Sequence, residues 1–164
     1  MSVPDALRPL AFLVGEWSGT GRGDYPTIDG FTFRHDLTVT NDGRPFLQSV
    51  SRAWVLDERG EATRPPAVEV GFWRPAPGGG AELLLVLPTG IAEVYAGRAD
   101  GVRADVATHA VARTPTAKEV TAGRRVYALE GDELSYAHDM AGAGQPLQRH
   151  ITSRLRRRGD GGTA

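Results

Sequence analysis

The sequence predicts an all-β fold, an antiparallel sheet rolled into a barrel, from three observations. Segments in which apolar and polar residues alternate recur along most of the chain, and this period of two is typical of half-buried strands. Glycine, proline, asparagine and aspartate gather between these segments at hairpin spacing. The strands do not alternate with helices, so a parallel sheet is not expected. A closed barrel of roughly eight to ten strands can hold one small ligand in its interior.

Length and composition indicate a single domain spanning residues 1–164, with 40% hydrophobic and 24% charged residues. The net charge of −1 gives no attraction to nucleic acid or to an anionic membrane. No segment is long and apolar enough to span a bilayer or to act as a secretory signal, so we expect a cytoplasmic protein without a membrane partner. The absence of cysteine excludes disulfides, thiolate zinc sites, iron–sulfur clusters and covalently attached heme.

The N-terminal segment Ser2–Val14 is predicted to form a short helix. Pro4 and Asp5 stand at a suitable start, and Pro9 keeps the helix short or irregular. One face is apolar, with Leu7, Leu10 and Leu13. We expect this helix to plug one end of the barrel.

The first strand follows in Gly15–Ile28, where glycine recurs at alternate positions. One face of this strand therefore lacks side chains, so another backbone or a flat ligand could approach it closely. The alternative, which we favour for most of these glycines, is that they let the strand bend at a corner of the barrel. Trp17 is expected to pack across the barrel floor.

The next two strands are Phe31–Thr40, with strict alternation, and Phe46–Val55, joined by a hairpin turn at Asn41–Gly43. His35 shares the apolar phase, which favours a hydrogen-bonded histidine in the barrel wall. The polar segment Asp57–Pro66 is predicted to be a loop.

The middle strands include Val68–Trp73 and the nearly continuous apolar segment Leu83–Leu87, which is either buried on both sides or lines a cavity. A tight turn at Pro88–Gly90 precedes a strand beginning at Ile91. The strand Val102–Ala110 places His109 in the outward phase, as expected of a surface histidine.

The C-terminal strands are predicted at Arg125–Leu129, Leu134–Asp139 and Leu147–Arg156. His138 is either part of the barrel wall or a surface residue. Arg156–Arg158 are expected in a solvated tail, and residues 157–164 are expected to be disordered.

His150 is the strongest candidate for a functional residue because it stands in a bounded, patterned segment near the end of the fold. Gly142, Gly144 and Pro146 form a turn before it, and alternation follows it. In a regular strand His150 would face away from Ile151. Ligand-binding barrels often have both polar and apolar side chains inside, so the face of the strand that carries His150 could point inward. The spacing of the apolar residues fits a helix as well, and of the two we prefer the strand.

The sequence lacks the G-x-S-x-G, H-E-x-x-H, phosphate-loop and dinucleotide motifs of common enzyme classes. Its four histidines are not spaced as a preformed metal site. A single useful histidine suits a cofactor that brings its own metal and most of its ligands. Heme is such a cofactor, because one neutral imidazole can be its axial ligand.

The segment Gly15–Gly21 reads G-x-W-x-G-x-G and resembles the signature of the nitrobindins, and Gly23 and Tyr25–Ile28 extend the match. The first signature alone would be weak, whereas an ordered set of matches is specific. Further matching segments follow in order over almost the whole chain: Gly43–Leu47, Gly71–Arg74, Pro88–Ile91, Glu93-Val94, Ala117–Val120, Gly131–Tyr136, and Gly144–Gln148 with His150.

This resemblance implies a ten-stranded antiparallel β-barrel akin to the lipocalin and fatty-acid-binding folds, with one non-covalent heme b per subunit. It implies peroxynitrite isomerase activity on ferric heme, giving nitrate, and reversible binding of nitric oxide. His150 occupies the position of the axial iron ligand and is the expected catalytic residue. Thr27 and Lys118 match further heme contacts, although a solvated surface lysine is the alternative at Lys118. The sequence leaves open whether the protein forms a homodimer.

Two other function classes stay open as well. The same barrel could carry a fatty acid or another small apolar molecule without any catalysis, which the apolar segment Leu83–Leu87 favours. It could also have lost its cofactor and serve as an interaction domain, against which the presence of His150 argues. Addition of hemin and a visible absorption spectrum would separate these classes.

Overall fold

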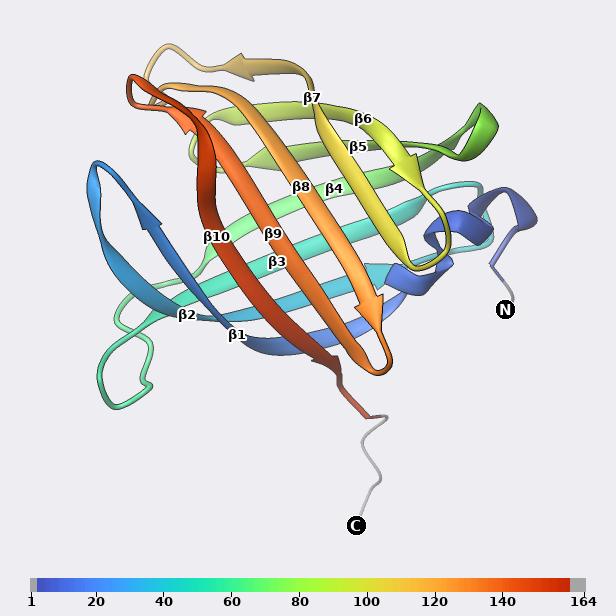
Figure 1. Ribbon diagram of the computed structural model, residues 1–164, viewed down its shortest axis with the longest axis horizontal. Helices are drawn as coiled ribbons and strands as arrows, with labels where there is room; N and C mark the ends of the chain where they lie inside the picture. Colours follow the sequence, from blue (N-terminus) through green and yellow to red (C-terminus); the bar gives the residue numbers. More distant parts are fainter. Residues whose placement is uncertain (1–2, 160–164) are drawn as a thin grey trace.

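The segments with period-two alternation form strands in the computed structural model, which describes residues 3–159 (Figure 1). Two short 3₁₀ helices, η1 (Asp5–Leu13) and η2 (Pro77–Gly79), accompany them. The ten strands are β1 (Gly15–Tyr25), β2 (Ile28–Thr40), β3 (Leu47–Leu56), β4 (Ala67–Ala76), β5 (Gly80–Leu87), β6 (Ile91–Ala99), β7 (Arg103–Arg113), β8 (Val120–Glu130), β9 (Glu133–Gly142) and β10 (Gln145–Arg157).

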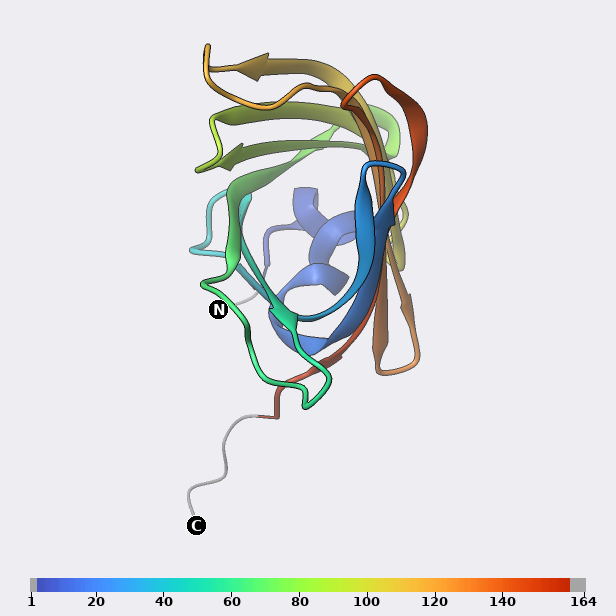
Figure 2. The same cartoon turned by 90° about the vertical axis from the view of Figure 1, so that its left-hand side faces the viewer.

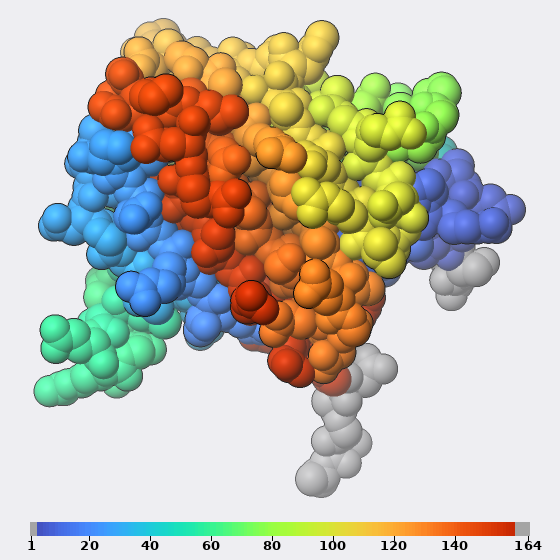
Figure 3. All heavy atoms as spheres, viewed as in Figure 1, coloured from blue at the N-terminus to red at the C-terminus, as the bar shows by residue number. Residues whose placement is uncertain are grey.

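The strands close into a barrel in which each pairs antiparallel with its neighbours in sequence and β1 pairs with β10. Gly19 of β1, for example, faces His35 of β2 on one side and Leu155 of β10 on the other. On the face shown in Figure 3, the C-terminal strands in red abut the first strands in blue. Each strand therefore has a partner on both sides, although β7 and β8 pair only between Arg103–Ala107 and Arg124–Ala128. The prediction of a ten-stranded antiparallel barrel with a short N-terminal helix is confirmed.

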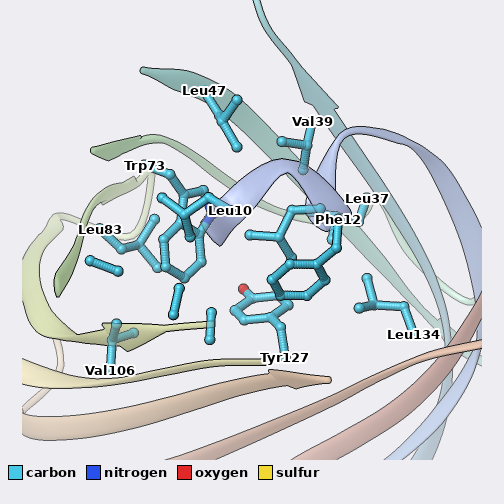
Figure 4. Close-up of a cluster of buried hydrophobic side chains, with 14 of the residues drawn as sticks. Leu10, Phe12, Leu37, Val39, Leu47, Trp73, Leu83, Val106, Tyr127 and Leu134 are labelled. Carbon is cyan, nitrogen blue, oxygen red and sulfur yellow. The ribbon is translucent and has the colours of Figure 1, made fainter. Parts of the chain in front are cut away.

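Helix η1 lies inside one end of the barrel (Figure 2). Leu7, Leu10 and Leu13 are spaced by three residues, so in a 3₁₀ helix they share one side, and all are buried. Together with Phe12 they pack among strand side chains such as those in Figure 4. Trp17 covers the helix and donates from Nε1 to the carbonyl of Leu13 at 2.9 Å. The predicted plug is therefore confirmed. Within residues 3–159 no helix is long and apolar enough to cross a membrane.

The alternate glycines of β1 allow close packing against neighbouring strands. A Cβ on Gly19 would lie 1.9 Å from the carbonyl oxygen of Arg154, and a Cβ on Gly21 would lie 2.6 Å from the Phe33 ring. Of the interpretations offered above, close approach of another backbone explains Gly19 directly. These contacts involve β10 and β2, so they explain the glycines without a ligand.

The apolar segment in β5 is not buried on both sides. Leu83 and Leu85 point into the barrel and are buried, whereas Leu84 is 37% and Val86 is 61% exposed. Leu87 lines the cavity described below. The first of the two predicted alternatives was thus wrong, because alternation of faces in a strand overrides a uniform hydrophobic composition.

The prediction of a solvated tail was wrong for Arg156–Arg158. Arg156 and Arg157 belong to β10 and pair with Ser18 and Trp17. The Arg157 guanidinium donates to the carbonyls of Phe12 and Val14 and lies over the Trp17 ring, and the amide of Arg158 donates to Glu16 at 2.8 Å. Arg157 thus ties the end of β10 to the plug. Residues 160–164 of the expected disordered tail lie outside the described residues.

Candidate functional site

A cavity of about 280 Å³ occupies the part of the barrel away from η1. Much of its wall is apolar or aromatic, and polar and charged side chains converge on it from several strands. His35, His138 and His150 all line it, whereas His109 is exposed on the outside, as predicted. An apolar cavity with a few convergent polar groups is the usual form of a small-molecule site.

His150 points into this cavity because β10 contains a β-bulge. Arg149 pairs with Asp139 and Ile151 pairs with His138, so His150 is an extra residue without a partner on β9. A bulge of this kind redirects side chains, and here both His150 and Ile151 line the cavity. The predicted strand is confirmed, and the bulge resolves the phasing conflict that strict alternation created.

The imidazole of His150 is held in one tautomer. Its Nδ1 lies 2.9 Å from the carbonyl oxygen of Asp24, which sits at a register irregularity in β1. A carbonyl can only accept, so Nδ1 is the N–H donor, and in the neutral ring the lone pair is therefore on Nε2. A histidine that ligates a metal is typically oriented by such a bond from its other nitrogen.

Aromatic side chains fix the ring plane of His150. The ring of Tyr25 packs edge-on against the imidazole with centroids 5.4 Å apart, and that of Phe31 does so at 6.3 Å. Tyr25 is itself fixed, because its hydroxyl accepts from the amide of Gly142 at 3.1 Å and donates to the carbonyl of Met140 at 3.0 Å. The imidazole is therefore preorganised before any ligand enters.

The inner wall of the cavity contains a buried ion-pair cluster around Arg125. Its guanidinium is fully buried and donates to both oxygens of Glu69, at 2.7 and 2.8 Å, and more weakly to Glu93 at 3.4 Å. It also donates to the hydroxyls of Tyr95 and Tyr136, at 3.0 and 2.8 Å. Burial alone would raise the pKa of Glu69, but the charge and hydrogen bonds of Arg125 outweigh it and hold that pKa below its ordinary value.

The other two cavity histidines are neutral at pH 7. His35 is hydrogen-bonded to Ser153 at 2.8 Å and to Ser51 at 2.9 Å, as expected of a histidine in the barrel wall. Burial lowers the pKa of His35 to about 4, and it lowers the pKa of His138 well below its ordinary value. The Nε2 of His138 has no hydrogen-bond partner among the described residues, and its ring lies 6.0 Å from that of His150.

The two other predicted contact residues lie in loops outside the cavity lining. Thr27 is exposed in the turn between β1 and β2, two residues after Tyr25. Lys118 is exposed in the loop between β7 and β8, close in sequence to Val120, which does line the cavity. Thus of the three predicted site residues only His150 is among the cavity-lining residues.

Sequence reasoning missed the charged residues of the cavity. Arg125 shares the phase of Tyr127 and Leu129, and Glu93 shares that of Ile91 and Tyr95, so a charge in an apolar phase was the available signal. Arg64, which lines the cavity from the predicted loop, offered no such signal.

Comparisons with known proteins agree with this geometry. Residues 6–157 match the family model for a THAP4-like, heme-binding β-barrel domain. A peroxynitrite isomerase of a Nocardioides species is 50% identical over 93% of this chain and 96% of its own length. A ferric nitrobindin-like protein of Kineococcus radiotolerans is 41% identical over 94% of each chain. The crystal structure of Rv2717c from M. tuberculosis superposes with a TM-score of 0.86 at 35% identity, over 96% of this chain and 100% of that one.

Proposed function

The chain belongs to the THAP4-like, heme-binding β-barrel family, and from this premise we propose that it binds one heme b in the cavity and isomerises peroxynitrite to nitrate. The resemblance to the nitrobindins, inferred from the sequence, is confirmed by the family match and by the relatives. Those relatives have nearly the same length as this chain, so the proposed activity concerns the whole barrel.

The observation that supports this function best is the hydrogen bond that orients the imidazole of His150. Its Nδ1–H is committed to the carbonyl of Asp24, so a neutral imidazole presents the Nε2 lone pair to a ligand. Such an imidazole is a typical axial ligand for heme iron. Within residues 3–159 no group of three or more His, Cys, Asp or Glu side chains is arranged to hold a metal ion, so the iron would have to arrive with the porphyrin's own nitrogens.

The remaining lining also fits a porphyrin. Phe31, Phe33, Leu87, Ile91 and Val120 give the cavity apolar walls suited to a flat macrocycle. The cavity volume of about 280 Å³ lies just below the range of roughly 300–1,000 Å³ for ligand pockets, so the cavity would enclose only part of a porphyrin. A cavity of this size that is open to solvent suits a ligand with one apolar part inside and one polar edge outside.

The reaction asks little of the protein beyond binding and enclosure. Isomerisation moves one oxygen within the anion, so it requires no net proton, electron or second substrate. A bound ferric heme supplies a Lewis-acidic coordination position for the anion. His150 would hold the iron from one side, and the apolar walls would keep water from the reacting groups. Because burial lowers the pKa of His35 and of His138, these two side chains are not expected to act as general acids at pH 7.

The finer parts of the proposal follow the family resemblance. We propose that Thr27 and Lys118 make additional heme contacts, since both stand in loops whose neighbours, Tyr25 and Val120, adjoin the cavity or His150. We further propose reversible nitric oxide binding, a ferric resting state and a cytoplasmic location, and we leave the homodimer to measurement.

A hemin titration tests the function. The wild type should develop a Soret band that saturates at one hemin per chain, and H150A should lose it. H109A is the matched control, because His109 is exposed and does not line the cavity, so this variant should leave the band unchanged. Stopped-flow mixing of peroxynitrite with the loaded wild type should accelerate its decay to nitrate.

Two results would contradict the proposal. A wild type that does not bind hemin but binds a fatty acid would favour the carrier function. Full hemin occupancy with an unaltered band in H150A would exclude His150 as the axial ligand.

A further inference from the structure

The charges around the cavity are unevenly distributed between its interior and its rim. Inside, two carboxylates, Glu69 and Glu93, face the single guanidinium of Arg125. The donors of Arg125 are directed to Glu69, Glu93, Tyr95 and Tyr136. An anionic group that entered deeply would therefore meet a net negative charge and no uncommitted cation.

At the rim the charge is positive, because Arg64 also lines the cavity. It lies in the loop between β3 and β4, which projects beyond the strands in Figures 1 and 3. Among residues 3–159 Arg64 has no ion-pair partner, in contrast to Arg125. Its guanidinium is thus available to a ligand.

The backbone around Arg64 is held in place although the residue is exposed. The amide of Thr63 donates to the carbonyl of Val55 at 3.0 Å, and its hydroxyl donates to the same oxygen at 3.2 Å. Two prolines, Pro65 and Pro66, follow, and a proline disfavours the helical conformation for the residue before it, which restricts the backbone of Arg64. The loop therefore keeps Arg64 at the rim.

We infer that Arg64 is a carboxylate clamp that binds a propionate of the heme at the rim of the cavity. This inference rests on the proposed function. A guanidinium matches a carboxylate with two parallel hydrogen bonds, and the negative interior opposes entry of the propionates. The two effects together orient an amphipathic porphyrin with its carboxylates outward, beside Arg64, and its apolar edge inward.

The experiment compares the dissociation of two porphyrins from the loaded protein. Hemin and hemin dimethyl ester, which lacks the carboxylate charges, are each transferred from wild type, R64Q and R59Q to an excess of apomyoglobin. Arg59 is the matched control, because it lies in the same loop but does not line the cavity. We expect R64Q to release hemin about 3- to 10-fold faster than wild type, and the ester at the wild-type rate. R59Q should match wild type with both.

Each other outcome is decisive. Equal hemin release from R64Q and wild type would overturn the clamp while leaving the proposed function intact. Equal acceleration for hemin and its ester would mean that Arg64 acts without a carboxylate, and would overturn it as well. Failure of the wild type to bind hemin at all would instead refute the proposed function.

Discussion

Replacing Arg125 with methionine would leave the buried Glu93 and the partly buried Glu69 without a counter-charge. The guanidinium is completely buried, Glu93 is 3% exposed and the Glu69 side chain is 21% exposed, so Glu93 in particular could not regain water. Removing one partner of a buried ion pair costs roughly 3–5 kcal/mol, because the remaining charge stays desolvated and unpaired. We therefore expect R125M to lose about that much free energy of unfolding.

Urea unfolding followed by tryptophan fluorescence measures this loss. With a slope of about 2 kcal/mol/M, the midpoint should fall by roughly 1.5–2.5 M. R156M is the control, since Arg156 pairs with Asp132 in solvent, and such pairs contribute about 0–1 kcal/mol. The variant E69Q/E93Q/R125M should recover most of the loss, because it removes the unpaired charges.

A midpoint for R125M within about 0.5 M of that for R156M would refute the reasoning. It would mean that water or a rearranged side chain replaces the guanidinium at little cost. A triple variant as unstable as R125M would point to packing, and not charge, as the source of the loss.

Three further predictions concern other parts of the barrel. Burial lowers the pKa of His35 from 6.5 to about 4, so between these pH values the unfolded state binds more protons than the folded state. The free energy of unfolding, measured by urea titration, should therefore fall by about 3 kcal/mol between pH 6.5 and pH 4. If H35Q showed the same dependence of this free energy on pH as the wild type, the prediction would be wrong. G19A should lose about 1–3 kcal/mol, because its Cβ would overlap the Arg154 carbonyl, whereas at Gly30 the nearest atom is 3.7 Å away and G30A should be nearly neutral in thermal unfolding. H138L should keep or raise the melting temperature of the heme-free protein, because it removes an unpaired buried nitrogen; a large drop would indicate an unseen partner.

Much of the fold was predictable because its determinants are local. Alternation and turn residues identified the strands, and the spacing of Leu7, Leu10 and Leu13 identified the plug. Which face of a strand points inward is, in contrast, not determined by the local sequence. In β4 the apolar Val70 and Phe72 are 39% and 42% exposed, while Glu69 turns toward the cavity. The inward carboxylate is stabilised by Arg125, 56 residues away, and no pattern within β4 reveals that partner.

The position of His150 illustrates the same limit at the scale of one residue. Strict alternation directs it away from Ile151, and a single unpaired residue in the β9–β10 ladder reverses that outcome. The bulge depends on cross-strand pairing, which the sequence of β10 alone does not specify. Its consequence is chemical as well as geometric. Because β10 bulges where β1 is irregular at Asp24, the backbone carbonyl of Asp24 accepts a hydrogen bond from Nδ1–H of His150. The local break in sheet pairing thus provides both the inward direction of the imidazole and the free Nε2 on which iron binding would depend.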